Sequence, residues 1–154
     1  MRLLLLIVGL AIPGLSQVEK AAIRTTGISC GVCAGLSEYY FKRMDGVDKV
    51  TISLSQEAIT LSYKPDSAFD PGAIRRVLKS MEVGVVQLQI NARGSVQEQN
   101  GKRFLVAGRN KFVVAAAGNA PGVPIGSPLS IEGTLNDRVE PIEVKILNFK
   151  PLKQ

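Results

Sequence analysis

Two cysteines, Cys30 and Cys33, are the residues whose type and spacing are best suited to chemistry in this chain. Cysteine pairs with this spacing occur in redox, zinc and structural settings alike, so the spacing by itself does not choose among them. Histidine is absent, which removes imidazole both as a metal ligand and as the base in Ser-His or Cys-His pairs. A structural zinc site needs four protein ligands, and two cysteines cannot supply them within one chain.

The residues around the pair predict a strand, a short loop and a helix. Val18 to Thr26 has the alternation of a strand, and the pattern from Cys33 onward is helical. Spacings of three and four predict one buried stripe on that helix, formed by Cys33, Leu36, Tyr40 and Met44.

The start of a helix is a favourable place for a thiolate. Backbone N–H groups and the helix dipole stabilise negative charge there, so the pKa of the Cys33 thiol is expected to be lowered. Two thiolates on a loop suit a soft ion of low coordination number, such as Cu(I), better than zinc. The pair therefore favours a soft-metal site.

The segment up to Asn91 predicts a ferredoxin-like arrangement. Alternating apolar residues predict a hairpin of two strands, at 50–54 and 59–63, and a last strand at 86–90. Asp70 and Pro71 predict the cap and first position of a second helix, whose apolar stripe is Ile74, Val77, Leu78 and Met81. The order βαββαβ is that of ferredoxin-like folds, so we expect an α+β protein with such a domain at 17–91.

The character of the chain changes after Asn91. Residues 92–101 are polar and contain glycine, which predicts a linker. Four apolar or alternating runs follow, separated by Gly-, Pro- and Asn-rich turns, at 104–107, 112–117, 129–135 and 142–149. They predict a small all-β domain at 102–154, an OB-like barrel or a sandwich. A β-rich extension without a core of its own is the alternative.

Residues 1–16 have the pattern of an export signal. Arg2 supplies the positive start, Leu3 to Ile12 form the apolar run, and Gly14 and Ser16 are the small residues that a signal peptidase requires. The apolar run is too short to span a bilayer. We expect cleavage after Ser16, a mature chain without a membrane span, and a periplasmic or secreted location.

Two motifs resemble those of the heavy-metal-associated (HMA) domain, found in copper chaperones, copper-exporting ATPases and periplasmic mercury-binding proteins. Gly27-Ile28-Ser29-Cys30-Gly31-Val32-Cys33 resembles the metal-binding loop of this family, and Gly46-Val47-Asp48-Lys49-Val50 resembles the end of its first helix. Ile28 replaces the methionine that anchors the loop in the family. The segment 80–85 lacks the Gly-aromatic pair that lies beside the loop.

The resemblance implies a metal-binding protein without catalytic residues or an organic cofactor. Cys30 and Cys33 would be the ligands of one soft ion, with Cu(I) the first candidate and Hg(II) the second. Such a protein would sequester the ion or hand it on, and a membrane metal transporter would be its partner.

Other classes of function are less well supported. The net charge of +6 comes without a basic block or a tryptophan, so nucleic-acid binding is not expected. Two alternatives stay open on the cysteine pair. One is a periplasmic thiol-disulfide redox protein, and the other is an interaction module in which the two cysteines form a structural disulfide.

Overall fold

The computed structural model describes residues 16–28 and 30–153, so the predicted export signal at 1–16 lies outside the described residues except for Ser16. The elements are β1 (Gln17–Thr26), α1 (Gly31–Lys42), β2 (Val47–Ser53), β3 (Ala58–Tyr63), α2 (Pro71–Ser80), β4 (Gly84–Gln99), β5 (Lys102–Ala107), β6 (Asn110–Val114), β7 (Leu129–Asn136) and β8 (Glu143–Pro151). Among these residues no helix is long and apolar enough to cross a membrane.

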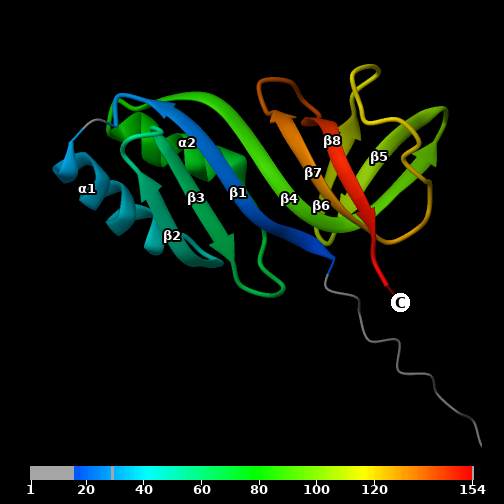
Figure 1. Cartoon of the computed structure of the whole chain (residues 1–154), viewed down its shortest axis with the longest axis horizontal. Coiled ribbons are helices and arrows are strands. Elements are labelled where there is room, and N and C mark those ends of the chain that lie inside the picture. Colours follow the sequence, from blue (N-terminus) through cyan, green and yellow to red (C-terminus); the bar gives the residue numbers. More distant parts are fainter. Residues whose placement is uncertain (1–15, 29, 154) are drawn as a thin grey trace, which may run out of the picture.

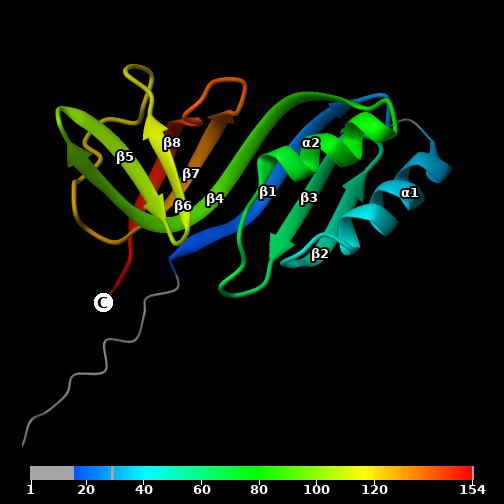
Figure 2. The same ribbon diagram turned by 180° about the vertical axis from the view of Figure 1, so that it is seen from behind.

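The first six elements have the predicted βαββαβ order. They form an antiparallel sheet in the order β2-β3-β1-β4, with α1 and α2 on one face (Figures 1 and 2). Side chains on that face are buried because alternate residues of a strand point to the same side; they include Ala21, Ile23, Ile59, Leu61, Leu88 and Ile90. The α+β class and the ferredoxin-like order are confirmed for this part of the chain.

The two helices differ in how well their buried faces were predicted. In α2, Asp70 caps the first turn by accepting a 2.9 Å hydrogen bond from the Gly72 N–H, and Ile74 and Leu78 are buried as expected. In α1 the predicted stripe is wrong, because Leu36 and Tyr40 are 46% and 44% exposed.

The buried face of α1 is formed by Ser37 and Phe41. The predicted face with Leu36 and Tyr40 lies about 100° around the helix from the face with Ser37 and Phe41. Because apolar residues occur on both faces, their spacing alone fits either one. Phe41 takes the core position, since burying an aromatic ring gives a large hydrophobic gain.

The linker predicted at 92–101 is wrong. Residues 92–99 are the second half of β4, a strand of 16 residues. Ala92, Gly94 and Val96 face the interior and alternate with polar residues that face solvent. The polar character of the segment thus belongs to the solvent face of a strand.

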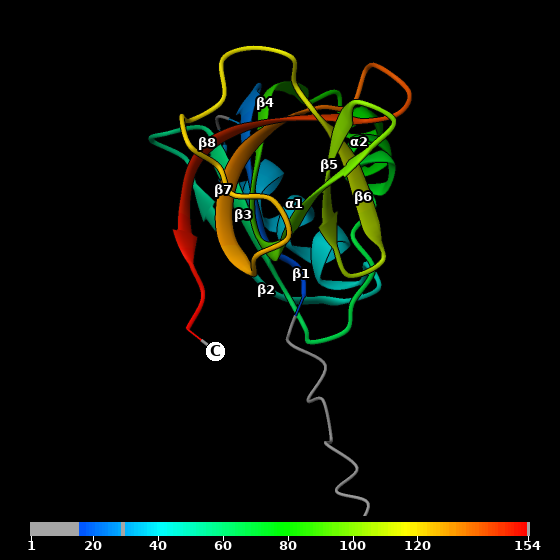
Figure 3. The same ribbon diagram turned by 90° about the vertical axis from the view of Figure 1, so that its right-hand side faces the viewer.

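β4 is also the first strand of a closed barrel. Its five strands pair in the order β4-β5-β6-β8-β7, and β7 pairs back with β4 (Figure 3). The four predicted apolar runs are thus strands β5 to β8. Gly94 permits the closure on β5, because a Cβ atom there would lie 2.1 Å from the Val106 carbonyl oxygen.

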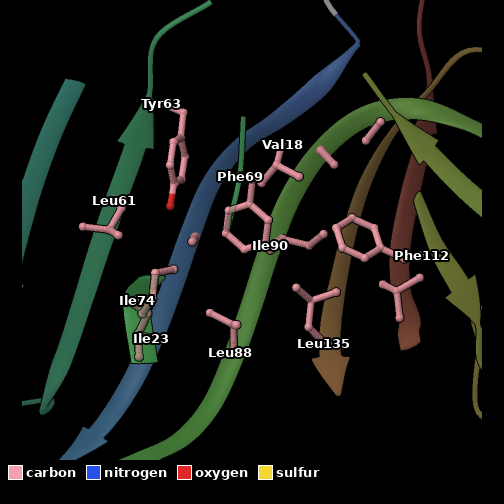
Figure 4. Close-up of a cluster of buried hydrophobic side chains, with 14 of the residues drawn as sticks. Val18, Ile23, Leu61, Tyr63, Phe69, Ile74, Leu88, Ile90, Phe112 and Leu135 are labelled. Carbon is pink, nitrogen blue, oxygen red and sulfur yellow. The ribbon is translucent and has the colours of Figure 1, made fainter. Parts of the chain in front are cut away.

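The two halves of the molecule share one core. The ferredoxin-like half comprises β1 to β3, both helices and the start of β4, and the barrel half comprises the rest of β4 with β5 to β8. Phe69, in the loop before α2, packs edge-on against Tyr63 on one side and Phe112 of β6 on the other (Figure 4). The Asn110 side chain donates a 2.8 Å hydrogen bond to the Phe69 carbonyl oxygen. The barrel is therefore fused to the first sheet along β4 and through this aromatic row.

Candidate metal site

The turn between β1 and α1 holds the cysteine pair. Gly27 has a φ of +94°, a left-handed conformation that glycine adopts without strain. Ile28 is fully buried, so it anchors the turn in the core, as expected for the residue that replaces methionine. The chain therefore bends sharply at Gly27, is anchored in the core at Ile28 and presents Cys30 at the surface.

Cys30 is the N-cap residue of α1. Its Sγ accepts a 3.2 Å hydrogen bond from the Cys33 backbone N–H, and its carbonyl oxygen accepts one of 3.1 Å from the Ala34 N–H. Both cysteines are free thiols; Cys30 is exposed and Cys33 is half-buried. The fold thus brings the two predicted ligands together within the first turn of one helix.

The pKa values of the two thiols are shifted in opposite directions. Hydrogen bonds from the Cys33 side chain and backbone lower the pKa of the Cys30 thiol. The hydrogen bond to Cys30, with a smaller contribution from burial, raises the pKa of the Cys33 thiol. The sequence predicts a lowered pKa for Cys33, whereas in the structure the pKa of Cys30 is lowered, because its Sγ lies at the cap position and accepts the Cys33 N–H.

Ser37 is a residue of the site that sequence reasoning missed. It is fully buried one turn after Cys33, and its Oγ donates a 2.8 Å hydrogen bond to the Cys33 carbonyl oxygen. The same hydroxyl lies 3.6 Å from Sδ of Met81, at the end of α2. The signal that could have found it is a serine at the i+4 position from the second cysteine.

The turn after α2 lies against the cysteine loop, where the resemblance predicts a Gly-aromatic pair. The carbonyl oxygen of Glu82 is 3.7 Å from the place a Cβ of Gly27 would take. Glu82 has a φ of +59°, and Val83 is buried beside it. Glu82 thus adopts a backbone conformation that glycine would adopt without strain.

Exposed apolar side chains lie close to the two cysteines in the sequence. Val32 is 73% exposed and lies between the two cysteines in sequence; Leu36, Tyr39 and Tyr40 follow on the outer face of α1. In the described part of the chain, no group of three or more Cys, Asp or Glu side chains comes together around one point. Any metal site here would therefore rest on Cys30 and Cys33.

The chain is similar to parts of larger copper proteins. It is 27% identical over 103 residues to a copper-exporting P-type ATPase of Staphylococcus saprophyticus, a match that covers 67% of this chain and 12% of the ATPase. A copper-exporting P-type ATPase of Staphylococcus epidermidis is 24% identical over 122 residues, covering 77% of this chain and 15% of the ATPase. The chain thus spans a small fraction of the length of these relatives.

Among solved structures, a CopZ metallochaperone matches 44% of this chain and 98% of its own, with 22% identity and a TM-score of 0.41. No family model matches the chain. The ATPase matches support an HMA-like family, and the βαββαβ order of the ferredoxin-like half agrees with it.

Proposed function

We propose that this protein binds one Cu(I) ion through Cys30 and Cys33 and sequesters it or hands it on. The observation that carries the proposal is the pair of free thiols at the start of α1, joined by the hydrogen bond from the Cys33 N–H to Cys30 Sγ. The copper-exporting ATPases to which the chain is similar support copper as the cargo.

The chemistry of the pair favours a soft ion. Two thiolates without imidazole match the low coordination number that Cu(I) accepts, whereas zinc takes four ligands. Hg(II) is also soft and is the second candidate. The protein contributes a cap position that stabilises the first thiolate and a buried anchor, Ile28, that holds the turn.

Transfer requires that a partner reach the bound ion. The exposure of Cys30 and of the neighbouring apolar residues Val32 and Leu36 supports such access. We propose a membrane copper transporter as the partner and an extracytoplasmic location, which rests on the predicted signal at 1–16. Cleavage after Ser16 would leave all of β1 in place but would remove the hydrogen bonds of the Ser16 hydroxyl to Arg93 and Gly108.

Titration of the reduced protein with Cu(I), in competition with a Cu(I)-specific chelator, tests the proposal. We expect one ion per chain and near-complete loss of tight binding in Cys30→Ser and in Cys33→Ser, since one thiolate cannot enclose a two-coordinate ion. Affinity should fall as pH is lowered, because thiols must release their protons to bind. Val32→Ala, which changes the same loop but keeps both thiols, should bind normally.

Stoichiometric Cu(I) binding by the Cys30→Ser/Cys33→Ser double variant would place the site elsewhere. One observation favours a second function: Cys30 is exposed and its thiol pKa is lowered, as in dithiol redox proteins. That alternative predicts turnover of a disulfide substrate that depends on Cys30, together with weak Cu(I) binding. The same variants therefore separate the two functions.

A further inference from the structure

The barrel half contains a cavity that copper binding does not use. The cavity has a volume of about 630 Å³ and lies between β4, β5, β6, β8 and the loop that joins β6 to β7. Figure 1 places this part of the barrel at the end of the molecule away from the helices and the cysteine loop. Small-molecule sites commonly have volumes of about 300 to 1,000 Å³ and occur in the mouths of β-barrels.

The loop over the cavity, at 115–128, is tied to the barrel at two places. Asn119 Oδ1 accepts a 2.9 Å hydrogen bond from the Ile146 N–H, and the Ala120 N–H donates one of 2.7 Å to the Ile146 carbonyl oxygen. Further along, the Gly126 N–H donates a 2.8 Å hydrogen bond to the Val96 carbonyl oxygen. Small residues at Ala115, Ala116, Ala120 and Gly122 line the cavity, so the loop borders it without filling it.

The lining combines an apolar wall with a cation. Val96 and Ile146 of the barrel core lie buried beneath the cavity, and half-buried Val114 and Val123 form its accessible apolar wall. Alternation along β5 places Arg103 on the same side as buried Leu105 and Ala107, so its side chain projects toward the open end of the barrel. Lys102 is a second cation of the lining and Glu143 its one carboxylate, so the net charge of the lining is positive.

Arg103 is available for a ligand. Glu98 is its cross-strand partner, yet among residues 16–28 and 30–153 Arg103 forms no ion pair. A guanidinium group presents paired N–H donors that match the two oxygens of a carboxylate. We propose that this cavity binds a small carboxylate with an apolar body, the carboxylate on Arg103 and the body against Val114 and Val123.

Amide NMR titration of the full chain with phenylbutyrate, and with the neutral phenylbutanol as a matched probe, tests the proposal. We expect saturable shifts at the amides of Val96, Ala120 and Ile146, with a dissociation constant below about 1 mM. Phenylbutanol and the Arg103→Ala variant should each weaken binding about tenfold, because a charge-assisted hydrogen bond is lost. Ala120→Phe, which fills the cavity, should abolish the shifts.

Three further variants make the result specific. Lys111, an exposed cation on the outer face of β6 that lies 4.2 Å over the Phe104 ring, should be replaceable by Ala without effect. Glu98→Gln should strengthen binding about twofold by removing a like charge near the carboxylate. The Cys30→Ser/Cys33→Ser variant should bind the carboxylate normally. Shifts outside the cavity, equal binding of alcohol and acid, or unchanged affinity in Arg103→Ala would each overturn the proposal.

Discussion

The ferredoxin-like half and the barrel half differ in how their sequences encode structure. In the first half, helices and strands have distinct periodicities, and the helix cap at Asp70 marks a boundary. In the barrel half every element is a strand. Most consecutive strands form hairpins there, but the two pairings that close the barrel, β4 with β7 and β6 with β8, join strands that are not neighbours in the sequence. Leu88 on β4, for example, pairs with Leu135 on β7. The local sequence pattern therefore identifies the strands in both halves. Only in the first half does it also indicate the order of the strands in the sheet.

The shared core shows that the two halves are not independent, and replacing its central ring tests this most strongly. Phe69→Ala should lower the free energy of unfolding by about 3 to 5 kcal/mol, because it removes a buried ring from between Tyr63 and Phe112. Denaturant unfolding, followed separately by probes in each half, should give one coincident transition. Two separate transitions would mean that the halves have separate cores.

A second prediction compares the two faces of α1. Phe41→Ala should cost about 3 to 5 kcal/mol, since the side chain is fully buried. Leu36→Ala should change stability by less than about 0.5 kcal/mol, because Leu36 lies at the surface. The same denaturant melts check both variants, and a large cost for Leu36→Ala would support the face predicted from the sequence.

The error on α1 has a physical cause that applies beyond this helix. Periodicity finds a face only where the apolar residues are confined to one side, and here Leu36, Tyr39 and Tyr40 lie exposed beside buried Phe41. The excess of apolar residues is a surface feature next to the cysteines. Likewise, residues 92–99 were mistaken for a linker because their partners, β5 and β7, come later in the chain.

The cysteine pair is easier to recognise in the sequence than the contacts around it. Cys30 and Cys33 are found by residue type and spacing alone, and buried Ile28 fits the anchor position. Ser37 is less visible in the sequence: its bond to the Cys33 carbonyl oxygen is a local i to i−4 contact, but its contact with Met81 depends on how α2 packs against α1. Local motifs thus identify the ligands, whereas tertiary packing determines what holds them.

The ion pair between Arg75 on α2 and Asp137 after β7 also joins the two halves. Arg75 donates two hydrogen bonds to the carboxylate, one of them 2.6 Å, and Asp137 is almost fully buried. Asp137→Asn should cost about 1 to 3 kcal/mol. Arg76→Gln breaks the exposed pair of Arg76 and Asp70 and should cost less than about 1 kcal/mol.

The pH dependence of stability provides a check on this pair. Burial opposes ionisation of Asp137, but the hydrogen bonds and charge of Arg75 outweigh it and lower the pKa of the carboxyl group. A lowered folded-state pKa stabilises the protein above the unfolded pKa, about 3.9 for aspartate, and the gain is lost as pH falls through the folded pKa. The wild type should therefore lose stability below about pH 4 more steeply than Asp137→Asn. Parallel curves would contradict this assignment.

The smallest expected effect concerns the turn beside the cysteine loop. Glu82 has a left-handed φ of +59°, which costs a residue with a Cβ atom roughly 1 kcal/mol relative to glycine. Glu82→Gly should thus raise the free energy of unfolding by up to about 1 kcal/mol, less the entropy that glycine loses on folding.

Glu57 has a similar φ of +48° in the turn between β2 and β3, far from the cysteines in the sequence. Glu57→Gly is therefore the control for the backbone strain: both variants should gain stability by a similar amount. Glu82→Gly should change Cu(I) affinity more, because the Glu82 backbone packs against Gly27, whereas the Glu57 carbonyl oxygen contacts Thr25 in β1. A loss of stability in Glu82→Gly would show that the Glu82 side chain makes contacts that outweigh the backbone strain.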